Sequence, residues 1–175
     1  LLVDGLCAVI RGIPMVVILL VLNYVILGRT GLSGAAVSVI GFSLVFGCSV
    51  CGMLTVGLDG VAPGELEAGL ALGYTPTQVF FKIGLPQAVR QVLPIYRGEF
   101  IGTMKLTSIV GYIAVQDLTK AGDLIRARTL EAFFPLIVTA LLYFLMANLL
   151  SVALRSVEKR VDPKRRKRRI KGVKM

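Results

Sequence analysis

Two long stretches of the chain carry no charged side chain. They are residues 35–58 and 132–154, which are 24 and 23 residues long. Because a helix needs about 20 apolar residues to cross the hydrocarbon core of a bilayer, both stretches predict membrane-spanning helices. A shorter apolar run, residues 13–27, reaches spanning length if it begins at residue 6 and Arg11 extends toward the membrane surface.

A fourth apolar run, residues 88–115, is interrupted by charge. It contains four charged side chains: Arg90, Arg97, Glu99 and Lys105. Such a helix should turn its charged side toward protein or a water-filled cavity. The pattern therefore predicts an all-α membrane protein, a polytopic helical bundle with spans at about residues 6–27, 35–58, 88–115 and 132–154.

Composition and charge agree with a membrane protein and predict its orientation. The chain is 55% hydrophobic and only 17% charged, whereas soluble domains have about 25% charged residues. Of the net charge of +10, +9 falls on residues 155–175. Lysine and arginine next to a span mark the cytoplasmic side. We therefore divide the chain into a transmembrane domain, residues 1–160, and a basic cytoplasmic tail, residues 161–175.

The orientation of the tail predicts the sides of the other connections. Counting back through four spans places residues 59–87 in the cytoplasm, and residues 28–34 and 116–131 outside. The tail is a topology signal or a binding site for anionic membrane lipid; nucleic acid is not an expected partner. The chain opens at Leu1 within apolar sequence, without an initiator Met or a signal peptide. We therefore expect an N-terminal truncation, with one span missing.

Residues 59–87 have the local signals of two short helices. Pro63 suits the first turn of a helix, and Gly73 suits the left-handed position that ends it. Thr75, Pro76 and Gln78 then have the spacing of an N-cap, a first-turn proline and a capping box. We expect the second helix to run to about residue 84 and to end at Pro86. The sequence predicts a helix, a sharp glycine turn and a second helix at the membrane surface.

The chain offers little to catalysis or to a metal. It has no histidine, which removes the commonest general base, and only three cysteines. Cys48 and Cys51 form a C-x-x-C pair, but zinc prefers four N or S ligands and a redox pair needs an electropositive, aqueous setting. We interpret both as buried small residues on a helix. We expect no catalytic residue, no metal site and no cofactor.

The segment 59–87 contains a pattern with fixed spacing. Glu67-Ala68-Gly69 is followed after three residues by Gly73, and after nine more by Ile83-Gly84-Leu85-Pro86. The pattern resembles the EAA loop of bacterial ABC importer permeases, with Gly69 in place of the second alanine. The resemblance implies that Glu67, Ala68, Gly69, Gly73, Ile83, Leu85 and Pro86 couple the chain to an ABC ATPase. The alternative is an ordinary amphipathic helix at the interface.

Other short stretches are similar to the polar amino-acid uptake branch of these permeases, the histidine, glutamine and arginine type. They are Arg11-Gly12-Ile13-Pro14, Leu85-Pro86-Gln87-Ala88, Gly98-Glu99-Phe100-Ile101 and Lys105-Leu106-Thr107-Ser108. The resemblance implies a permease subunit of the bacterial inner membrane that carries polar amino acids. It also implies ATPase subunits, a second permease copy or sister permease, and an extracytoplasmic substrate-binding protein or domain.

The coupling role is physically reasonable because the chain has no G-x-x-x-x-G-K-[ST] loop to hold ATP phosphates. A rigid pair of short helices, docked on a partner ATPase, could transmit its closure to the attached spans. The chain is then a transporter subunit and not an enzyme. A passive channel or structural membrane subunit, which needs no ATPase, is the alternative, and a membrane-embedded enzyme would require clustered carboxylates or metal ligands.

Four residues near the end of the charged span are candidates for the substrate path: Glu99, Lys105, Thr107 and Ser108. Charge within a membrane segment favours a functional role, and Lys105 could attract a substrate carboxylate. It could instead form an ion pair with Glu99 inside the bundle. Thr107 and Ser108 could bind substrate, although such hydroxyls more often support helix packing.

Overall fold

The computed structural model describes residues 2–161, which contain helices and no strand. The elements are, in chain order, α1 (Leu2–Gly12), α2 (Met15–Leu20), the π-helix η1 (Val21–Ile26), α3 (Gly34–Asp59), α4 (Pro63–Ala71), α5 (Pro76–Val79), the π-helix η2 (Phe80–Gly84), α6 (Leu85–Leu106), the 3-10 helix η3 (Thr107–Ile113), α7 (Leu118–Thr129) and α8 (Phe133–Val161). The all-α fold is as predicted. Of the basic tail, only Val161 belongs to the described residues.

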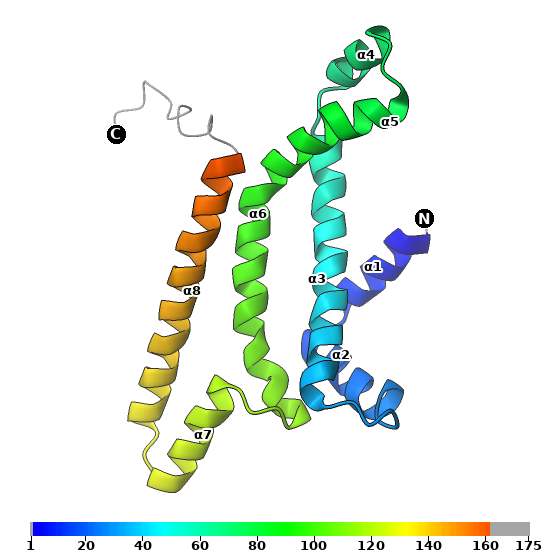
Figure 1. The fold of residues 1–175 in the computed structure, drawn as a ribbon. Coiled ribbons are helices and arrows are strands. Elements are labelled where there is room, and N and C mark those ends of the chain that lie inside the picture. Colours follow the sequence, from blue (N-terminus) through cyan, green and yellow to red (C-terminus); the bar gives the residue numbers. More distant parts are fainter. Residues whose placement is uncertain (1, 162–175) are drawn as a thin grey trace, which may run out of the picture.

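Three long helices run lengthwise beside one another (Figure 1). α6 lies in the middle and contacts α3 on one side and α8 on the other. The short helices α4 and α5 lie at the end of the bundle where α8 also ends, and α7 lies at the opposite end together with α2 and η1. The connections 59–87 and 116–131 therefore lie at opposite ends of the bundle.

Two helices of the described part are long and apolar enough to cross a membrane, namely α3 and α8. Their bounds agree with the predicted spans 35–58 and 132–154, except that α8 extends seven residues further. In the most apolar stretch of each helix, 11% of the residues of α3 and 0% of those of α8 are buried within this chain. Large apolar surfaces of this kind belong against lipid or another subunit.

The predicted span at residues 6–27 is not a straight helix. Residues 5–12 and 15–26 form two helical pieces that meet at an angle of 101°, either a broken span or a re-entrant loop. The break falls at Ile13 and Pro14, and Pro14 is the N-cap of α2 with φ −57° and ψ 137°. Proline disfavours a helical conformation for the residue before it, which explains the bend.

The predicted span 88–115 also differs from the structure. α6 begins at Leu85 and changes to a 3-10 helix at Thr107, which ends at Ala114 in a left-handed conformation. α6 contains four charged side chains and is therefore not among the helices whose composition is apolar enough to cross a membrane. Residues 116–131, predicted only as an outer connection, contain the twelve-residue helix α7. Asp117 caps α7 through hydrogen bonds from the backbone N–H groups of Thr119 and Lys120.

The expectation that Pro86 ends the second short helix is wrong. The helical path continues without a break from α5 through η2 into α6, and Pro86 lies in the first turn of α6. Inside a regular α-helix a proline removes a backbone donor, and its ring clashes with the carbonyl four residues earlier. In η2 the Leu85 N–H bonds to the carbonyl of Phe80 five residues earlier, so the wider π turn precedes the proline.

α3 and α6 approach closely near residue 57. Gly57 and Ala88 are buried, and a Cβ added at Gly57 would lie 2.5 Å from Val92 Cγ2 and 3.0 Å from the carbonyl oxygen of Ala88. Small residues allow helix backbones to approach in this way in membranes. The ends of α3 and α6 that lead into the segment 59–87 are therefore held in tight contact.

The two cysteines of the C-x-x-C pair both lie on α3, as expected, but only Cys48 is buried. Cys51 is exposed, so the expectation that both are buried is wrong for this position. No group of three potential ligands close enough to hold a metal ion occurs within residues 2–161.

Candidate functional site

The turn between α4 and α5 is built around Gly73. Leu72 is the C-cap of α4, and Gly73 follows it with φ +85°. The N–H of Gly73 donates to the carbonyl of Leu70 at 2.9 Å, and the N–H of Tyr74 donates to the carbonyl of Gly69 at 3.2 Å. These two bonds form a Schellman motif. The predicted left-handed glycine is confirmed, and it sets the direction in which the chain enters α5.

α5 begins with the predicted capping box. The backbone N–H of Gln78 donates to Thr75 Oγ1 at 3.3 Å, and the N–H of Thr75 donates to Gln78 Oε1 at 3.0 Å. Pro76 occupies the first turn, and Pro63 does the same in α4. Both helices of the segment 59–87 thus have a defined start, which makes the turn between them a fixed connection.

Gly69 lies where α4 packs against the second helix. It is buried, and a Cβ at this position would lie 2.6 Å from Ile83 Cδ1 and 3.1 Å from Val79 Cγ2. A glycine costs about 1 kcal/mol relative to alanine inside a helix. Here it allows α4 to lie close to α5 and η2, so the departure from the E-A-A pattern has a packing role.

The seven residues predicted to couple the chain to an ATPase divide into a packed set and an exposed set. Gly69 is buried, and Ile83 and Leu85 are half-buried. Exposed on the surface of the chain are the remaining four, Glu67, Ala68, Gly73 and Pro86. The structure brings both sets together in a single helical hairpin, in which the packed residues hold the shape and Glu67 projects a charge.

The segment that carries Glu67 also exposes large apolar side chains. Leu72 is 79% exposed, Phe81 60% and Leu70 48%. Tyr74 is exposed as well, and the ammonium group of Lys82 lies 5.0 Å from the centre of its ring. Exposed apolar side chains rimmed by charge are typical of protein interaction sites. The segment 59–87 therefore exposes apolar side chains in addition to the charge of Glu67.

A cavity of about 310 Å³ separates this hairpin from the end of α3. Its lining comes from Leu58, Asp59, Leu66, Leu70, Pro76, Val79 and Phe80. The second helix of the hairpin continues directly from α5 through η2 into α6.

The four residues predicted for the substrate path do not gather in one cavity. Glu99 and Lys105 line a shallow groove of about 410 Å³ on α6. Thr107 lines a second groove, between α3 and α6, and its hydroxyl donates to the carbonyl of Met104 at 2.7 Å. No ion pair joins Lys105 to Glu99 in the described part of the chain. The Thr107 hydroxyl therefore bonds to the backbone of its own helical turn.

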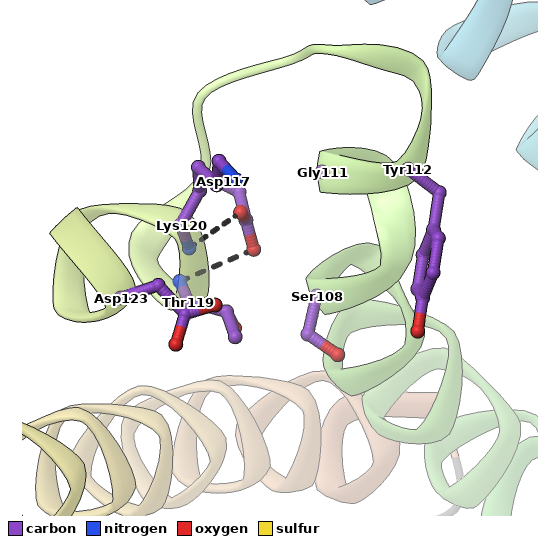
Figure 2. Close-up of a pocket in the computed structure, with 7 residues that line it drawn as sticks. All are labelled: Ser108, Gly111, Tyr112, Asp117, Thr119, Lys120 and Asp123. Atoms are coloured by element: carbon purple, nitrogen blue, oxygen red, sulfur yellow. Dashed lines mark hydrogen bonds between the residues drawn. The ribbon is translucent and has the colours of Figure 1, made fainter. Parts of the chain in front are cut away.

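Ser108 lies in a third, polar pocket at the end of the bundle opposite α4 and α5. Figure 2 shows Ser108 across this pocket from the N-terminal turn of α7, and the volume of the pocket is about 310 Å³. Both carboxylates in this pocket are engaged. Asp117 caps α7 and accepts a bond from the Tyr143 hydroxyl at 3.4 Å, and Asp123 pairs with Arg126 at 3.1 Å. The pocket is therefore chiefly a junction between η3, α7 and α8.

Two side-chain contacts between distant parts of the sequence were not predicted. Arg97 on α6 forms an ion pair with Glu158 on α8, at 2.7 Å between Nη1 and Oε2. Gln87 on α6 donates a hydrogen bond to the carboxylate of Glu65 on α4. The only sequence signal for the first was an arginine inside an apolar run, because a charge in such a position needs a partner.

Comparison with known proteins identifies the family. Residues 1–165 match the family described as the inner membrane component of binding-protein-dependent transport systems. The chain is 31% identical to the probable glutamine ABC transporter permease protein GlnM of Bacillus subtilis, over 87% of this chain and 71% of that protein. It is 28% identical to the arginine ABC transporter permease protein ArtQ of Haemophilus influenzae, over 87% and 73%.

A solved structure is similar as well. The crystal structure of an amino acid ABC transporter with histidines matches with a TM-score of 0.78 and 33% identity, covering 88% of this chain and 72% of that one. These relatives are permease subunits, which are components of transporters and not enzymes. With its helical bundle and its helix-glycine-helix segment, the chain belongs to the family of inner membrane components of binding-protein-dependent transport systems.

Proposed function

We propose that this chain forms the translocation path of an ATP-driven importer of polar amino acids, and that residues 59–87 couple it to a separate ABC ATPase. One observation carries the coupling role: the hairpin of α4 and α5 exposes Glu67 and large apolar side chains, while its second helix continues directly into α6. A body docked on the hairpin can move α6 without an intervening flexible link.

The substrate class is supported by the relatives. They are described as glutamine and arginine permeases, and the similar crystal structure is that of an amino acid transporter. Polar amino acids share an α-ammonium and an α-carboxylate group, so a path for several of them needs few residues specific to one side chain.

The sides of the membrane follow from the charge of the sequence. We propose that residues 59–87 and the end of α8 lie in the cytoplasm, because the lysines and arginines that follow α8 favour that side. α7 then lies outside, where an extracytoplasmic binding protein delivers substrate. The exposed faces of α3 and α8 would lie against lipid and a second permease subunit.

The coupling role is tested by reversing the charge of Glu67. Glu67→Lys replaces an exposed carboxylate on α4 and leaves the buried Gly69 contact unchanged. We expect binding of the ATPase to weaken about tenfold, since loss of a charged contact at an interface costs on the order of 1–2 kcal/mol at its rim. The measurement is co-purification of the ATPase with the membrane complex, together with amino-acid uptake. Unchanged binding and uptake would contradict the proposal.

For the substrate path we propose Glu99, Lys105, Thr107 and Ser108, with Lys105 as the residue that meets the substrate carboxylate. Lys105 is exposed on the chain and shares the groove on α6 with Glu99. A cation in a water-filled groove within the membrane attracts anionic groups. The proposal for Lys105 is stronger than for Thr107, whose hydroxyl already bonds to the backbone.

Lys105→Met is expected to lower uptake at least tenfold while ATPase binding and basal ATP hydrolysis stay unchanged, because only the substrate contact is removed. Arg90→Met, a change of the same kind on an exposed residue of α6, serves as the control and should have little effect. If Glu99→Gln restores uptake to Lys105→Met, the lysine acts on Glu99 and not on the substrate.

A further inference from the structure

Two glutamines on the first turns of α6 reach back toward the start of the coupling segment. Gln87 Nε2 donates to the carboxylate of Glu65, in the first turn of α4. Gln91 Nε2 donates to the backbone carbonyl of Gly60 at 3.5 Å, directly after the end of α3. The glutamines are four residues apart and therefore lie on one face of α6. Together they span the connection from α3 to α4.

The backbone at this connection leaves space for the side chain of Gln91. A Cβ at Gly60 would lie 2.6 Å from Gln91 Oε1, so the absence of a side chain lets the amide approach. Val61, the next residue, is 4% exposed. One helical turn earlier on α3, Gly57 packs against Ala88 and Val92 of α6. The two glutamines thus continue a tight interface between α3 and α6 up to the first turn of α4.

Without these bonds the two ends of the coupling hairpin would be attached unequally. At its far end, α5 passes through η2 into α6 as continuous helix. At its near end, α4 is joined to α3 only through Gly60, Val61 and Ala62, and its main packing partners are α5 and η2. A displacement of the hairpin would therefore reach α6 directly but reach α3 through a short non-helical link.

We propose that Gln87 and Gln91 are positioning residues for energy coupling. They tie α4 and the end of α3 to α6, so that a displacement of the hairpin moves both spans as one body. The inference rests on the proposed function of residues 59–87 and adds to it a role for residues outside the E-A-A pattern. Neither glutamine needs to contact the ATPase or the substrate.

These two hydrogen bonds are better suited to transmitting movement between helices than to stabilising the fold. Glu65 and Gln91 are exposed on this chain, and hydrogen bonds at an exposed surface add little to stability. Their loss should leave the bundle assembled. What should change is the amount of substrate moved for each ATP hydrolysed, because α4 can then shift relative to the packed ends of α3 and α6.

The experiment uses the complete transporter, with its ATPase and binding protein, reconstituted in lipid vesicles. Gln87→Glu sets two carboxylates against each other at the first contact, and we expect transport per ATP to fall about fivefold while bound ATPase stays constant. Adding Glu65→Gln exchanges the amide and the carboxylate between the two positions. This double variant should regain most of the lost transport per ATP, a rescue that a general structural defect would not give.

A matched control adds the same charge elsewhere in the segment. Gln78→Glu retains the capping box, because a glutamate accepts the bond from the Thr75 N–H equally well. It should leave transport per ATP unchanged. Gln91→Leu, which tests the second contact, should lower the ratio without an effect on bound ATPase.

Three results would overturn the proposal: an unchanged ratio in Gln87→Glu, failure of Glu65→Gln to rescue it, or an equal loss in Gln78→Glu. If Gln87→Glu reduces the amount of complex, the ratio is measured on the complex that remains, so the test still decides. Failure of the proposed function is distinguishable, because the unaltered chain would then not bind an ATPase at all.

Discussion

Gly73→Val is expected to abolish both binding of the ATPase and uptake, while membrane insertion and the amount of protein stay normal. Gly73 has φ +85°, where a β-branched side chain is strongly disfavoured, and forcing it there costs about 1–3 kcal/mol. The chain avoids this cost if it leaves the Schellman turn and redirects α5. The position of α5 relative to the exposed Glu67 and Leu72 would then change. The measurements are co-purification of the ATPase and amino-acid uptake.

Gly73→Asn is the matched control for this variant. Asparagine tolerates the left-handed conformation far better than valine, and nothing lies within 4 Å of the Cβ position at Gly73. The control should therefore keep most of the binding and uptake. Equal activity of the valine and asparagine variants would mean that the geometry of the turn does not matter, and the coupling role of the hairpin would lose its main support.

Predictions from the sequence were most accurate where a feature depends on a few neighbouring residues. The start of α4 at Pro63, the left-handed Gly73 and the capping box of Thr75 and Gln78 are all confirmed. Each depends on backbone geometry that one residue type favours within a single turn. The long uncharged runs also predicted α3 and α8, because hydropathy over 18 or more residues leaves few alternatives.

The sequence was less informative where two local preferences compete. Pro14 and Pro86 are both prolines within apolar sequence, yet one marks a 101° bend and the other lies in a continuous helix. The difference is the π turn before Pro86, which no pattern of apolar residues predicts. α7 was missed although Asp117 is a typical N-cap and the helix ends with Arg126 and Arg128.

Contacts between residues far apart in the sequence could not be predicted from the sequence alone. The bond from Gln87 to Glu65 spans 22 residues, and the ion pair of Arg97 and Glu158 spans 61. Spacing along one helix cannot identify a partner on another helix. The same limit applies to the substrate-path residues, since four candidates within ten residues of sequence line three separate spaces. Residues that are close in sequence on a helix can lie on different faces of that helix.

The ion pair between α6 and α8 leads to the second large expected effect. Arg97→Met is expected to destabilise the transporter by about 2–3 kcal/mol, because it removes a charge-assisted bond between two helices. The two side chains are only 27% and 16% exposed, so water replaces the lost bond poorly. The measurement is the unfolding temperature of the purified complex in detergent.

Two further variants separate the ion pair from a general effect of losing an arginine. Arg126→Met removes the partner of Asp123, in a pair that lies on one helix with side chains 49% and 42% exposed, and should change stability by no more than about 0.5 kcal/mol. Glu158→Met added to Arg97→Met replaces both charges by apolar groups and should recover more than half of the lost stability. A double variant as unstable as the sum of the single ones would show that Arg97 and Glu158 stabilise the bundle independently, and not as the pair that joins α6 to α8.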